Sequence, residues 1–309
     1  MLVKDAIARI RFNTNTNDDN TGRNINALFS NTNLVAELQM VLNQYASFTK
    51  AIQAIHTTPV QANTRSIQGP SDIIRKQGYK FVFIWLQGRK YPINAQPLVT
   101  TQTEFPTMGT VGIPQYITIW DNEVSFYPLP SSSRQETQLT NDITSSQINI
   151  DVSSTSSFIP QNGVITIGDE KIRYTSKTET QFLNCTRAYE GTIATEHDAS
   201  AIVQENNLYI YYCKYPFTIF VDSSDIISES DLNRDLAINE EHMPSIINLT
   251  TYNLLNKIDP TRAQPYKIDA VAFLSQAKTD VEQGDSAISP GSYIGRAYDW
   301  QGSNIGVSL

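Results

Sequence analysis

Apolar residues recur at helical spacing near both ends of the chain. One stripe occupies residues 2–12 and a longer one runs through residues 34–56, before Pro59. Residues 244–258 and 267–282 carry two further stripes of this kind. This spacing predicts amphipathic helices that pack together through their apolar faces.

The middle of the chain changes to alternation of apolar and polar residues, which is typical of β-strands. Residues 80–86, KFVFIWL, form a short aromatic and β-branched run that predicts a buried strand. Residues 115–130 alternate on both sides of Asp121-Asn122 and predict a hairpin. Residues 207–220 resume the alternation, and the simplest topology pairs them with the 116–127 stretch in one sheet.

A separate β pattern lies between these strands. A linker rich in Ser, Thr and Gln covers residues 131–146, and alternation with turns then fills residues 147–205. The predicted fold class is α+β, a helical bundle from the N- and C-terminal segments with a small β-sheet and an inserted all-β module. The predicted parts are a helical and β core in two pieces (1–140 and 206–283), the β module (141–205) and an extended C-terminal arm (284–309).

The C-terminal arm combines Gly and Ser with a few large side chains. It has too little apolar surface to fold alone, yet more than a simple spacer needs. We therefore predict that it becomes ordered on a partner, through Tyr293, Ile294, Tyr298 and Trp300.

Composition and charge narrow the choice of partners. Hydrophobic residues make up 40% of the 309 positions, enough for a sizeable core, and the formal net charge is −8. Such an acidic chain is a poor sequence-independent binder of nucleic acid. Cys185 and Cys213 do not form a disulfide framework, and each predicts a small buried side chain. Because the sequence has neither a membrane-length apolar run nor a signal-peptide pattern, we expect a soluble protein made in the cytoplasm.

The three histidines give weak signals for chemistry. His56, His197 and His242 have no partner at a metal-binding spacing. Glu196, His197 and Asp198 could contribute to a metal or acid–base site, but a polar turn is the favoured interpretation. His242 follows two glutamates in a segment that looks like a helix N-terminus, where acidic residues complement the helix dipole.

Other motifs also favour structural roles. Gly168-Asp169-Glu170 lies between two strand-like runs, so a hairpin turn explains it better than a carboxylate site. The tryptophans Trp85 and Trp120 could stack on a sugar, although aromatic residues in strands more often belong to a core or an interface. The sequence contains no phosphate-binding or nucleophile-elbow motif. We predict no enzyme, and no catalytic, cofactor-binding or metal-binding residue.

Within the β module, a few residues are expected to hold the structure. Gly163, Gly168 and Gly191 permit positive φ at turns. Alternation buries Tyr174 together with five other apolar side chains, and Arg187 is expected to bond to the backbone or to a nearby carboxylate. The buried neighbours of Tyr174 are expected to be Ile165, Ile167, Ile172, Phe182 and Val203.

Residues 158–203 resemble a small module that recurs in virion proteins of tailed phages. The sequence departs from the usual pattern of this module at two positions, because Ala188 and either Ser200 or Ala201 stand where glycine is usual. The resemblance rests on Gly163, Ile167, Gly168, Glu170, Ile172 and Tyr174 in its first half, and on Phe182, Thr186, Arg187, Gly191, Thr192, His197 and Val203 in its second.

The flanking chain is similar, in the order of its patterns, to head-to-tail connector proteins (adaptor or ring proteins) of short-tailed phages, including the crAss-like group. This similarity covers roughly residues 3–282. It implies a virion protein of the head–tail junction, made in the host cytoplasm, in a ring of about twelve subunits. Its partners would be the portal, a downstream tail or ring protein, and passing DNA that is not bound specifically, with no membrane. Alternatives are a baseplate or fibre-proximal tail protein, or a virion-associated cell-wall hydrolase acting through Glu170, Glu196 or His197.

Overall fold

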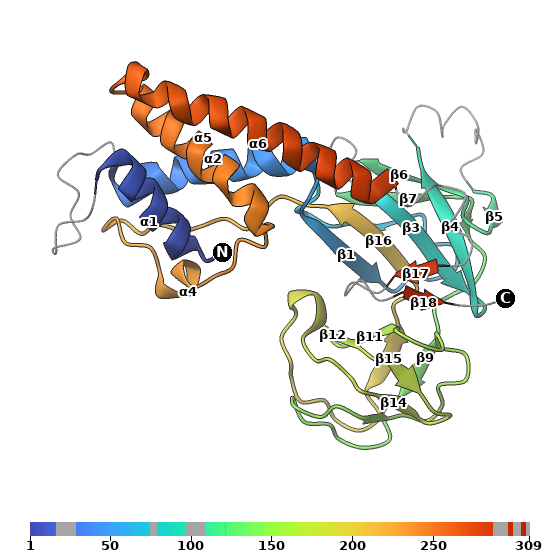
Figure 1. Cartoon of the computed structure of the whole chain (residues 1–309). Coiled ribbons are helices and arrows are strands. Elements are labelled where there is room, and N and C mark those ends of the chain that lie inside the picture. The colour runs from blue at the N-terminus through green and yellow to red at the C-terminus, as the bar shows by residue number, and fades with distance from the viewer. Residues whose placement is uncertain are drawn as a thin grey trace. The chain divides into compact units, whose positions relative to one another are not determined.

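The computed structural model describes residues 1–16, 29–74, 79–96, 109–120, 122–286, 296–298 and 304–306. The chain divides into two compact units (Figure 1). The helical unit contains residues 1–52 and 214–309, and the β unit contains residues 53–213.

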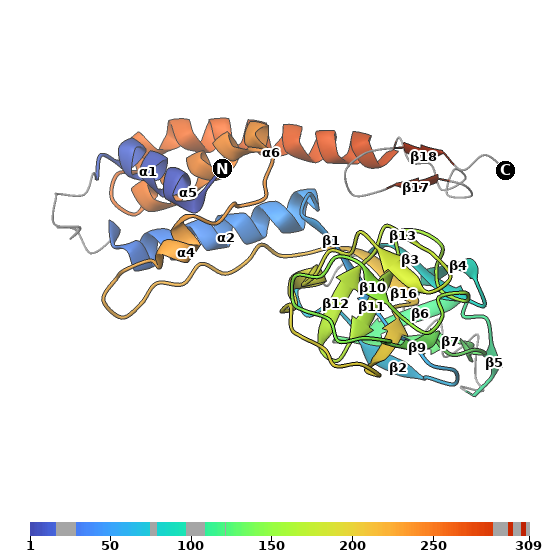
Figure 2. The ribbon, with the colours of Figure 1, turned by 90° about the horizontal axis from the view of Figure 1, so that it is seen from below.

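Within the helical unit, α5 is the central element. It packs against α1, α2 and α6, and α2 also contacts α6 (Figures 1 and 2). These contacts bury the apolar stripes that the sequence predicts, including Ile10 on α1, Leu38 on α2 and Ile246 on α5. The helices of this unit are α1 (Val3–Thr14), α2 (Asn31–Thr49), α4 (Glu229–Leu232), α5 (Met243–Asn256) and α6 (Pro260–Ser286), with a 3₁₀ turn at Glu240–His242.

Helix α2 begins at a double cap. The Ser30 side chain accepts the backbone N–H of Asn33, and the Asp225 carboxylate accepts the N–H groups of Asn31 and Thr32 at 2.8 and 2.7 Å. A residue 194 positions away in sequence thus satisfies the first turn of this helix.

The helix predicted over residues 34–56 is wrong in its second half. Helix α2 ends at Thr49, because Lys50 adopts a left-handed conformation with φ of 55°. Residues Gln53–Thr58 then form strand β1, which pairs with β16. Hydrogen bonding to a distant strand decides the conformation of this segment, whereas its local apolar spacing also suits a helix.

The β unit is built on a curled, half-barrel sheet of seven strands, in the order β1-β16-β3-β4-β6-β7-β2. Neighbouring strands are antiparallel except for the parallel pair β4 and β6. One face of the sheet buries a core that includes Ile84, Ile117, Phe126 and Ile210. The strands are β1 (Gln53–Thr58), β2 (Ser66–Gln68), β3 (Tyr79–Leu86), β4 (Arg89–Ala95), β6 (Tyr116–Trp120), β7 (Glu123–Tyr127) and β16 (Leu208–Cys213), and a separate parallel pair joins β5 (Val111–Gly112) to β8 (Leu129–Pro130).

Two predictions about this sheet have different outcomes. The hairpin predicted around residues 121 and 122 is confirmed by the antiparallel pair β6 and β7. The direct pairing of residues 207–220 with this hairpin is wrong. Strand β16 lies in the same sheet but between β1 and β3. The pattern did not indicate β1, which forms from the segment after α2 and takes one edge of β16.

The β module packs two small sheets around its own core. The sheet orders are β12-β11-β15-β9 and β10-β14-β13. The six side chains predicted to be buried are all at most 1% exposed. Strand β9 (Glu136–Gln138) precedes the predicted module and joins it by pairing with β15 (Ile202–Glu205). The other strands and turns of the module are β10 (Ile150–Asp151), β11 (Val164–Ile167), β12 (Glu170–Arg173), β13 (Ser176–Lys177), β14 (Gln181–Leu183) and the 3₁₀ turn η2 (Tyr189–Gly191).

The predicted fold class, a helical bundle with a small sheet, is wrong. The described chain is rich in β structure, with five helices and many strands, and its largest sheet has seven strands. The error has a physical source, since β1, β2 and β4 are short or weakly alternating. Strands β1 and β2 take their conformation from pairing with the distant strands β16 and β7, and β4 takes its conformation from a hairpin with β3.

Residues 284–286 of the predicted arm belong to α6, and its other described residues form a two-stranded antiparallel pair of β17 (Arg296–Tyr298) and β18 (Asn304–Gly306). Tyr298 belongs to β17, while Tyr293, Ile294 and Trp300 lie outside the described residues. Among the helices that the structure describes, none combines the length and the apolar character needed to cross a bilayer.

Candidate functional site

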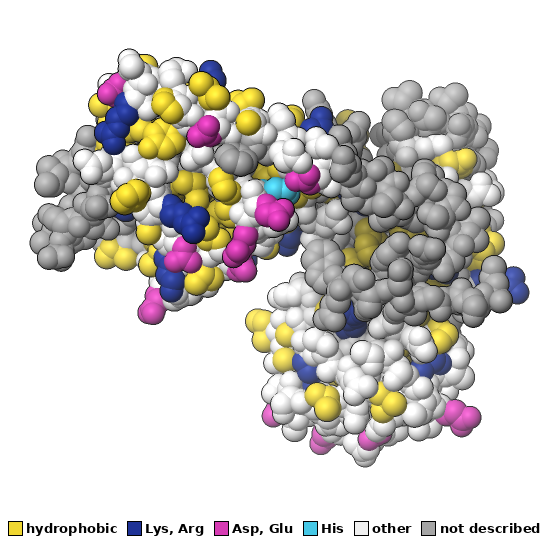
Figure 3. Space-filling model, in the orientation of Figure 1, with side chains coloured by type: hydrophobic (Ala, Val, Ile, Leu, Met, Phe, Trp, Pro, Cys, Tyr) yellow, Lys and Arg dark blue, Asp and Glu magenta, His cyan; other side chains and the backbone are white. Residues whose placement is uncertain are grey.

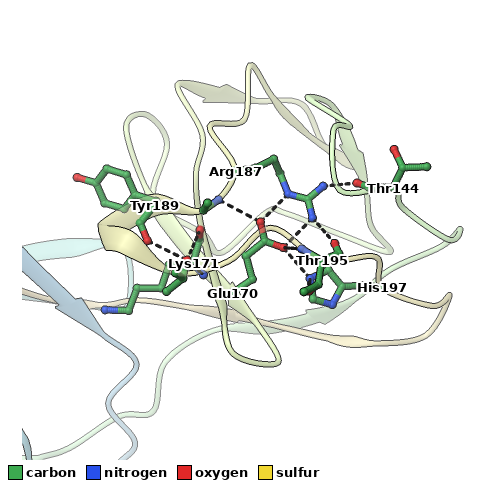
Figure 4. Close-up of polar contacts among 9 residues, drawn as sticks. Thr144, Glu170, Lys171, Arg187, Tyr189, Thr195 and His197 are labelled. Atoms are coloured by element: carbon green, nitrogen blue, oxygen red, sulfur yellow. Dashed lines mark hydrogen bonds and ion pairs between the residues drawn. The ribbon is translucent and has the colours of Figure 1, made fainter. Parts of the chain in front are cut away.

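The most concentrated set of charged side chains in the β module surrounds Glu170 (Figure 4). Glu170 is the first residue of β12, directly after the turn in which Gly168 has φ of 57°. Strand alternation turns its side chain inward with Ile172, so the carboxylate is fully buried. A buried charge of this kind needs close partners to persist.

Arg187 supplies the main partner. Its Nε donates to Glu170 Oε1 at 2.8 Å and its Nη2 donates to Oε2 at 2.7 Å, which is a two-pronged guanidinium–carboxylate contact. The remaining guanidinium donors reach the carbonyl oxygens of Thr144 and Thr195. The ion pair therefore joins the loop before β10, strand β12 and the loop after η2.

Three further groups complete the site. The backbone N–H groups of Ala188 and Thr195 donate to the Glu170 carboxylate at 3.1 and 3.2 Å, and His197 Nε2 lies 2.9 Å from Oε2. Burial alone would raise the pKa of Glu170, but the hydrogen bonds from Arg187, His197 and the two amides outweigh it and lower the pKa to about 2. Glu170 is thus ionised at neutral pH and has no proton to donate as a general acid.

A second polar centre attaches the module to strand β1. Glu190, in η2 with φ of 55°, accepts the Thr57 N–H at 2.9 Å and the Lys171 ammonium at 2.6 Å. Lys171 also donates to the Thr57 carbonyl, and His56 Nδ1 lies 3.8 Å from Glu190. Burial and the nearby Lys171 lower the pKa of His56. The contacts occupy hydrogen-bonding groups of an edge strand.

Aromatic packing continues this attachment across the sheet face. Phe83 and Tyr209 stack with ring centroids 4.8 Å apart, and both pack with Ile159 and Val164 of the module. The Val164 N–H donates to the Tyr209 hydroxyl at 3.1 Å. Module and sheet therefore share a hydrophobic core, which explains why they form one compact unit.

Glu205 lies at the end of β15, where the module returns to the sheet. Its side chain accepts the Ile159 N–H at 2.7 Å and the residue is 4% exposed. Burial raises the pKa of Glu205 to about 7, against the lowering effect of its backbone hydrogen bonds and of Lys177. Sequence reasoning missed Glu205, Glu190 and Lys171. Only the position of Glu205 at the end of an alternating strand could have drawn attention to it.

The histidines have structural contacts. His197 binds Glu170, while Glu196 and Asp198 beside it are exposed, so the three do not converge on one site. In the helical unit, His242 Nδ1 lies 2.6 Å from the Tyr45 hydroxyl and Nε2 lies 3.4 Å from Asp280. Within the part of the chain that the structure describes, no group of three or more His, Cys, Asp or Glu side chains could hold a metal ion.

The glycines singled out in the sequence have distinct roles. Gly168 and Gly191 have positive φ, as predicted, whereas Gly163 does not and the expectation for it is wrong. Gly163 instead makes room for Tyr174, since a Cβ there would lie 2.2 Å from the Tyr174 hydroxyl. That hydroxyl donates to the Ile159 carbonyl at 2.7 Å. Arg187 meets a carboxylate, as the sequence suggested.

Hydrophobic side chains reach solvent over the helices of the helical unit (Figure 3). Two grooves lie among the described residues of this unit. The α2 groove has a volume of about 1030 Å³ and lies along the outer side of α2. Tyr215, which precedes α4, and Leu274 of α6 complete its lining. Its exposed apolar residues are Met40, Phe48 and Tyr215, which are 42, 48 and 37% exposed. The α1 groove, about 410 Å³, contains Phe12 and Arg9 of α1 and Pro244 and Ile247 of α5.

A comparison with the known protein families finds no match for this chain, and a search of curated proteins finds none either.

Proposed function

We propose that the chain is a structural virion protein that forms a head-to-tail connector ring, docks on the portal and surrounds the channel through which DNA passes. One observation carries the proposal. The helical unit exposes Met40, Phe48 and Tyr215 at the α2 groove and Phe12 at the α1 groove. Exposed apolar patches of this kind mark protein–protein contact sites.

A ring requires two different surfaces on each subunit. A head-to-tail contact joins one patch of a subunit to another patch of its neighbour, and it closes into a ring when the rotation fits. The two grooves have different chemistry, since Arg9 lies in the α1 groove whereas uncharged residues line the α2 groove. Distinct surfaces support a heterologous contact rather than a symmetric dimer.

The charge of the chain is consistent with a DNA channel. The formal net charge of −8 disfavours adhesion of a phosphate backbone, so DNA could pass without being held. In this proposal the partners are other copies of the chain, the portal and a downstream tail protein. The protein then belongs to the head–tail junction of the virion.

The chemistry of the β module gives little support to the hydrolase alternative. Glu170 has its oxygens occupied by Arg187, His197 and backbone amides, and its pKa is lowered to about 2. A glycosidase needs a carboxyl group that stays protonated as the acid. The module is better explained as a stable structural body.

Light scattering coupled to size exclusion tests the proposal on the full chain. We expect an assembled species of about twelve copies, and Phe12→Asp should shift the protein towards smaller species by breaking one of the two contact surfaces. Ile193→Asp, at an exposed position in the module (78% exposed), is the matched control. A monomer at every concentration, with and without the portal protein, would overturn the proposal, and a rod-like trimer would favour the baseplate or fibre alternative.

A further inference from the structure

The outer side of α2 is apolar without being used by its own core. The inner side of this helix buries Leu34, Leu38 and Leu42 completely. On the outer side, Ala36, Met40 and Phe48 follow one another at helical spacing and line the α2 groove. Helix α2 needs only its inner face for the core of its own subunit, so its outer apolar face is available to a partner.

The α2 groove also has a particular polarity. Among the described residues that line it, none is charged, and amide or hydroxyl groups of Gln39, Asn43, Gln44 and Ser47 stand among the apolar side chains. Such a lining suits an occupant with aromatic anchors and neutral polar groups. One charged group adjoins this lining, because Lys278 Nζ lies 5.0 Å from the Phe48 ring centroid. A strongly basic segment is disfavoured, since its charges would lose water without gaining partners.

The C-terminal arm combines aromatic residues with neutral polar residues and few charges. Residues 287–309 contain 23 positions with one basic residue, Arg296, and one acidic residue, Asp299. Tyr293, Tyr298 and Trp300 are separated by small and polar residues. Each aromatic side chain can bury about 150–250 Å², so the three together approach the roughly 800 Å² that each partner contributes to a specific interface.

We propose that the α2 groove receives residues 287–309, from the C-terminal arm of a neighbouring copy of the chain. The inference rests on the proposed function, because a ring places equivalent copies side by side.

The course of α6 argues for a neighbour rather than the same chain. Helix α6 contributes Leu274 to the groove and continues to Ser286. Lys278 of α6 is still beside the groove, since its Nζ lies 5.0 Å from the Phe48 ring centroid, and eight further residues at 1.5 Å each carry the start of the arm about 12 Å beyond it. The seven residues from Ser286 to Tyr293 span at most about 25 Å, so an arm returning to its own groove would use about half of that length to reverse. A groove on the next copy requires no reversal.

Disulfide trapping between full-length variants tests the inference. One variant carries Gln44→Cys, at an exposed position in the groove, and the other carries Ser292→Cys in the arm. The native Cys185 and Cys213 are 5 and 0% exposed and give little background. An equal mixture of the two variants should form a covalent dimer under mild oxidation. Neither variant alone should, and Asn141→Cys, at an exposed site in the module, should not replace Gln44→Cys.

Substitutions in the groove give a second readout. Adding Phe48→Asp or Met40→Asp to the Gln44→Cys partner should lower the yield by about tenfold or more, because a carboxylate would be buried against apolar anchors. Ile193→Asp should leave the yield unchanged.

The remaining outcomes separate this inference from the proposed function. If the protein assembles but the mixture does not cross-link, the arm inference is wrong and the ring proposal stands. If a variant with both new cysteines cross-links only within one chain, the occupant is the chain's own arm and the neighbour assignment is wrong. A protein that stays monomeric contradicts the ring itself.

Discussion

The Arg187 guanidinium binds the Glu170 carboxylate through two nitrogens, 2.8 and 2.7 Å from its two oxygens, inside the β module. Both side chains are buried, at 7 and 0% exposure. Desolvation of such a pair is costly, and complete hydrogen bonding is the condition under which it can persist. Here two amides, two carbonyl groups and His197 supply the remaining partners.

Glu170→Gln should destabilise the module strongly. The substitution leaves the Arg187 charge buried without its counter-ion, which typically costs about 3–5 kcal/mol in the free energy of unfolding. Urea unfolding followed by tryptophan fluorescence measures the loss. Asp169→Asn, at the exposed neighbour in the same turn, should change the free energy by less than about 0.5 kcal/mol. Equal effects of the two substitutions would show that the ion pair is not the source of stability.

Gly163→Ala should destabilise the same module by a steric route. The new methyl group would lie 2.2 Å from the Tyr174 hydroxyl and 2.4 Å from its ring, and Tyr174 is fully buried. Overpacking of this kind costs about 1–3 kcal/mol. Gly109→Ala is the matched control, because a Cβ there meets nothing within 4 Å. Thermal unfolding midpoints of the two variants measure the difference. A Gly163→Ala protein as stable as the control would show that Tyr174 can shift away from the new methyl group without cost.

Glu205 should make stability depend on pH. Its pKa is about 7 in the folded protein and 4.5 for an ordinary glutamate, so the folded state favours the protonated form. Protonated Glu205 therefore contributes its full stabilisation of the folded protein below pH 4.5. This contribution is lost as the pH rises through 7. At about 1.36 kcal/mol per pH unit, the full effect is about 3 kcal/mol.

Glu205→Gln isolates this effect, because a neutral amide keeps the acceptor for the Ile159 N–H. Unfolding free energies at pH 5 and pH 8.5 should show the variant gaining about 3 kcal/mol relative to the parent protein between the two values. A parallel pH dependence of both proteins would contradict the raised pKa.

Asp225→Ala should weaken helix α2 from a distance. The substitution removes the acceptor for the N–H groups of Asn31 and Thr32, and loss of such a cap costs about 0.5–2 kcal/mol. Burial acts to raise the pKa of Asp225, but these hydrogen bonds outweigh it and lower the pKa, so the contribution of the cap is present above pH 3.8 and falls as the carboxylate protonates. Circular dichroism during guanidinium unfolding measures the loss. The neighbouring exposed Ser223→Ala should have no measurable effect, and an equal effect would argue against the cap.

Local pattern predicted the elements whose periodicity is strong. The helices at both ends, the β6–β7 hairpin and the buried side chains of the module follow directly from the spacing of apolar residues. The local pattern did not predict strand β1, because residues 52–56 also suit a helix and become a strand only by pairing with β16. The seven-stranded sheet was missed for the same reason.

The candidate site divides in a similar way. Glu170 and Arg187 were noticed because both belong to short patterns with turns around them. The links from Glu190 to Thr57 and from Glu205 to Ile159 join residues 133 and 46 positions apart. No local spacing encodes such contacts, since they depend on how the module docks on the sheet.

Negative-stain electron microscopy of the purified full-length protein, alone and mixed with the portal of the same virion, tests the central proposal most directly. We expect closed rings of about twelve copies that stack coaxially on the portal. Isolated single particles in both samples, with bare portals beside them, would contradict it.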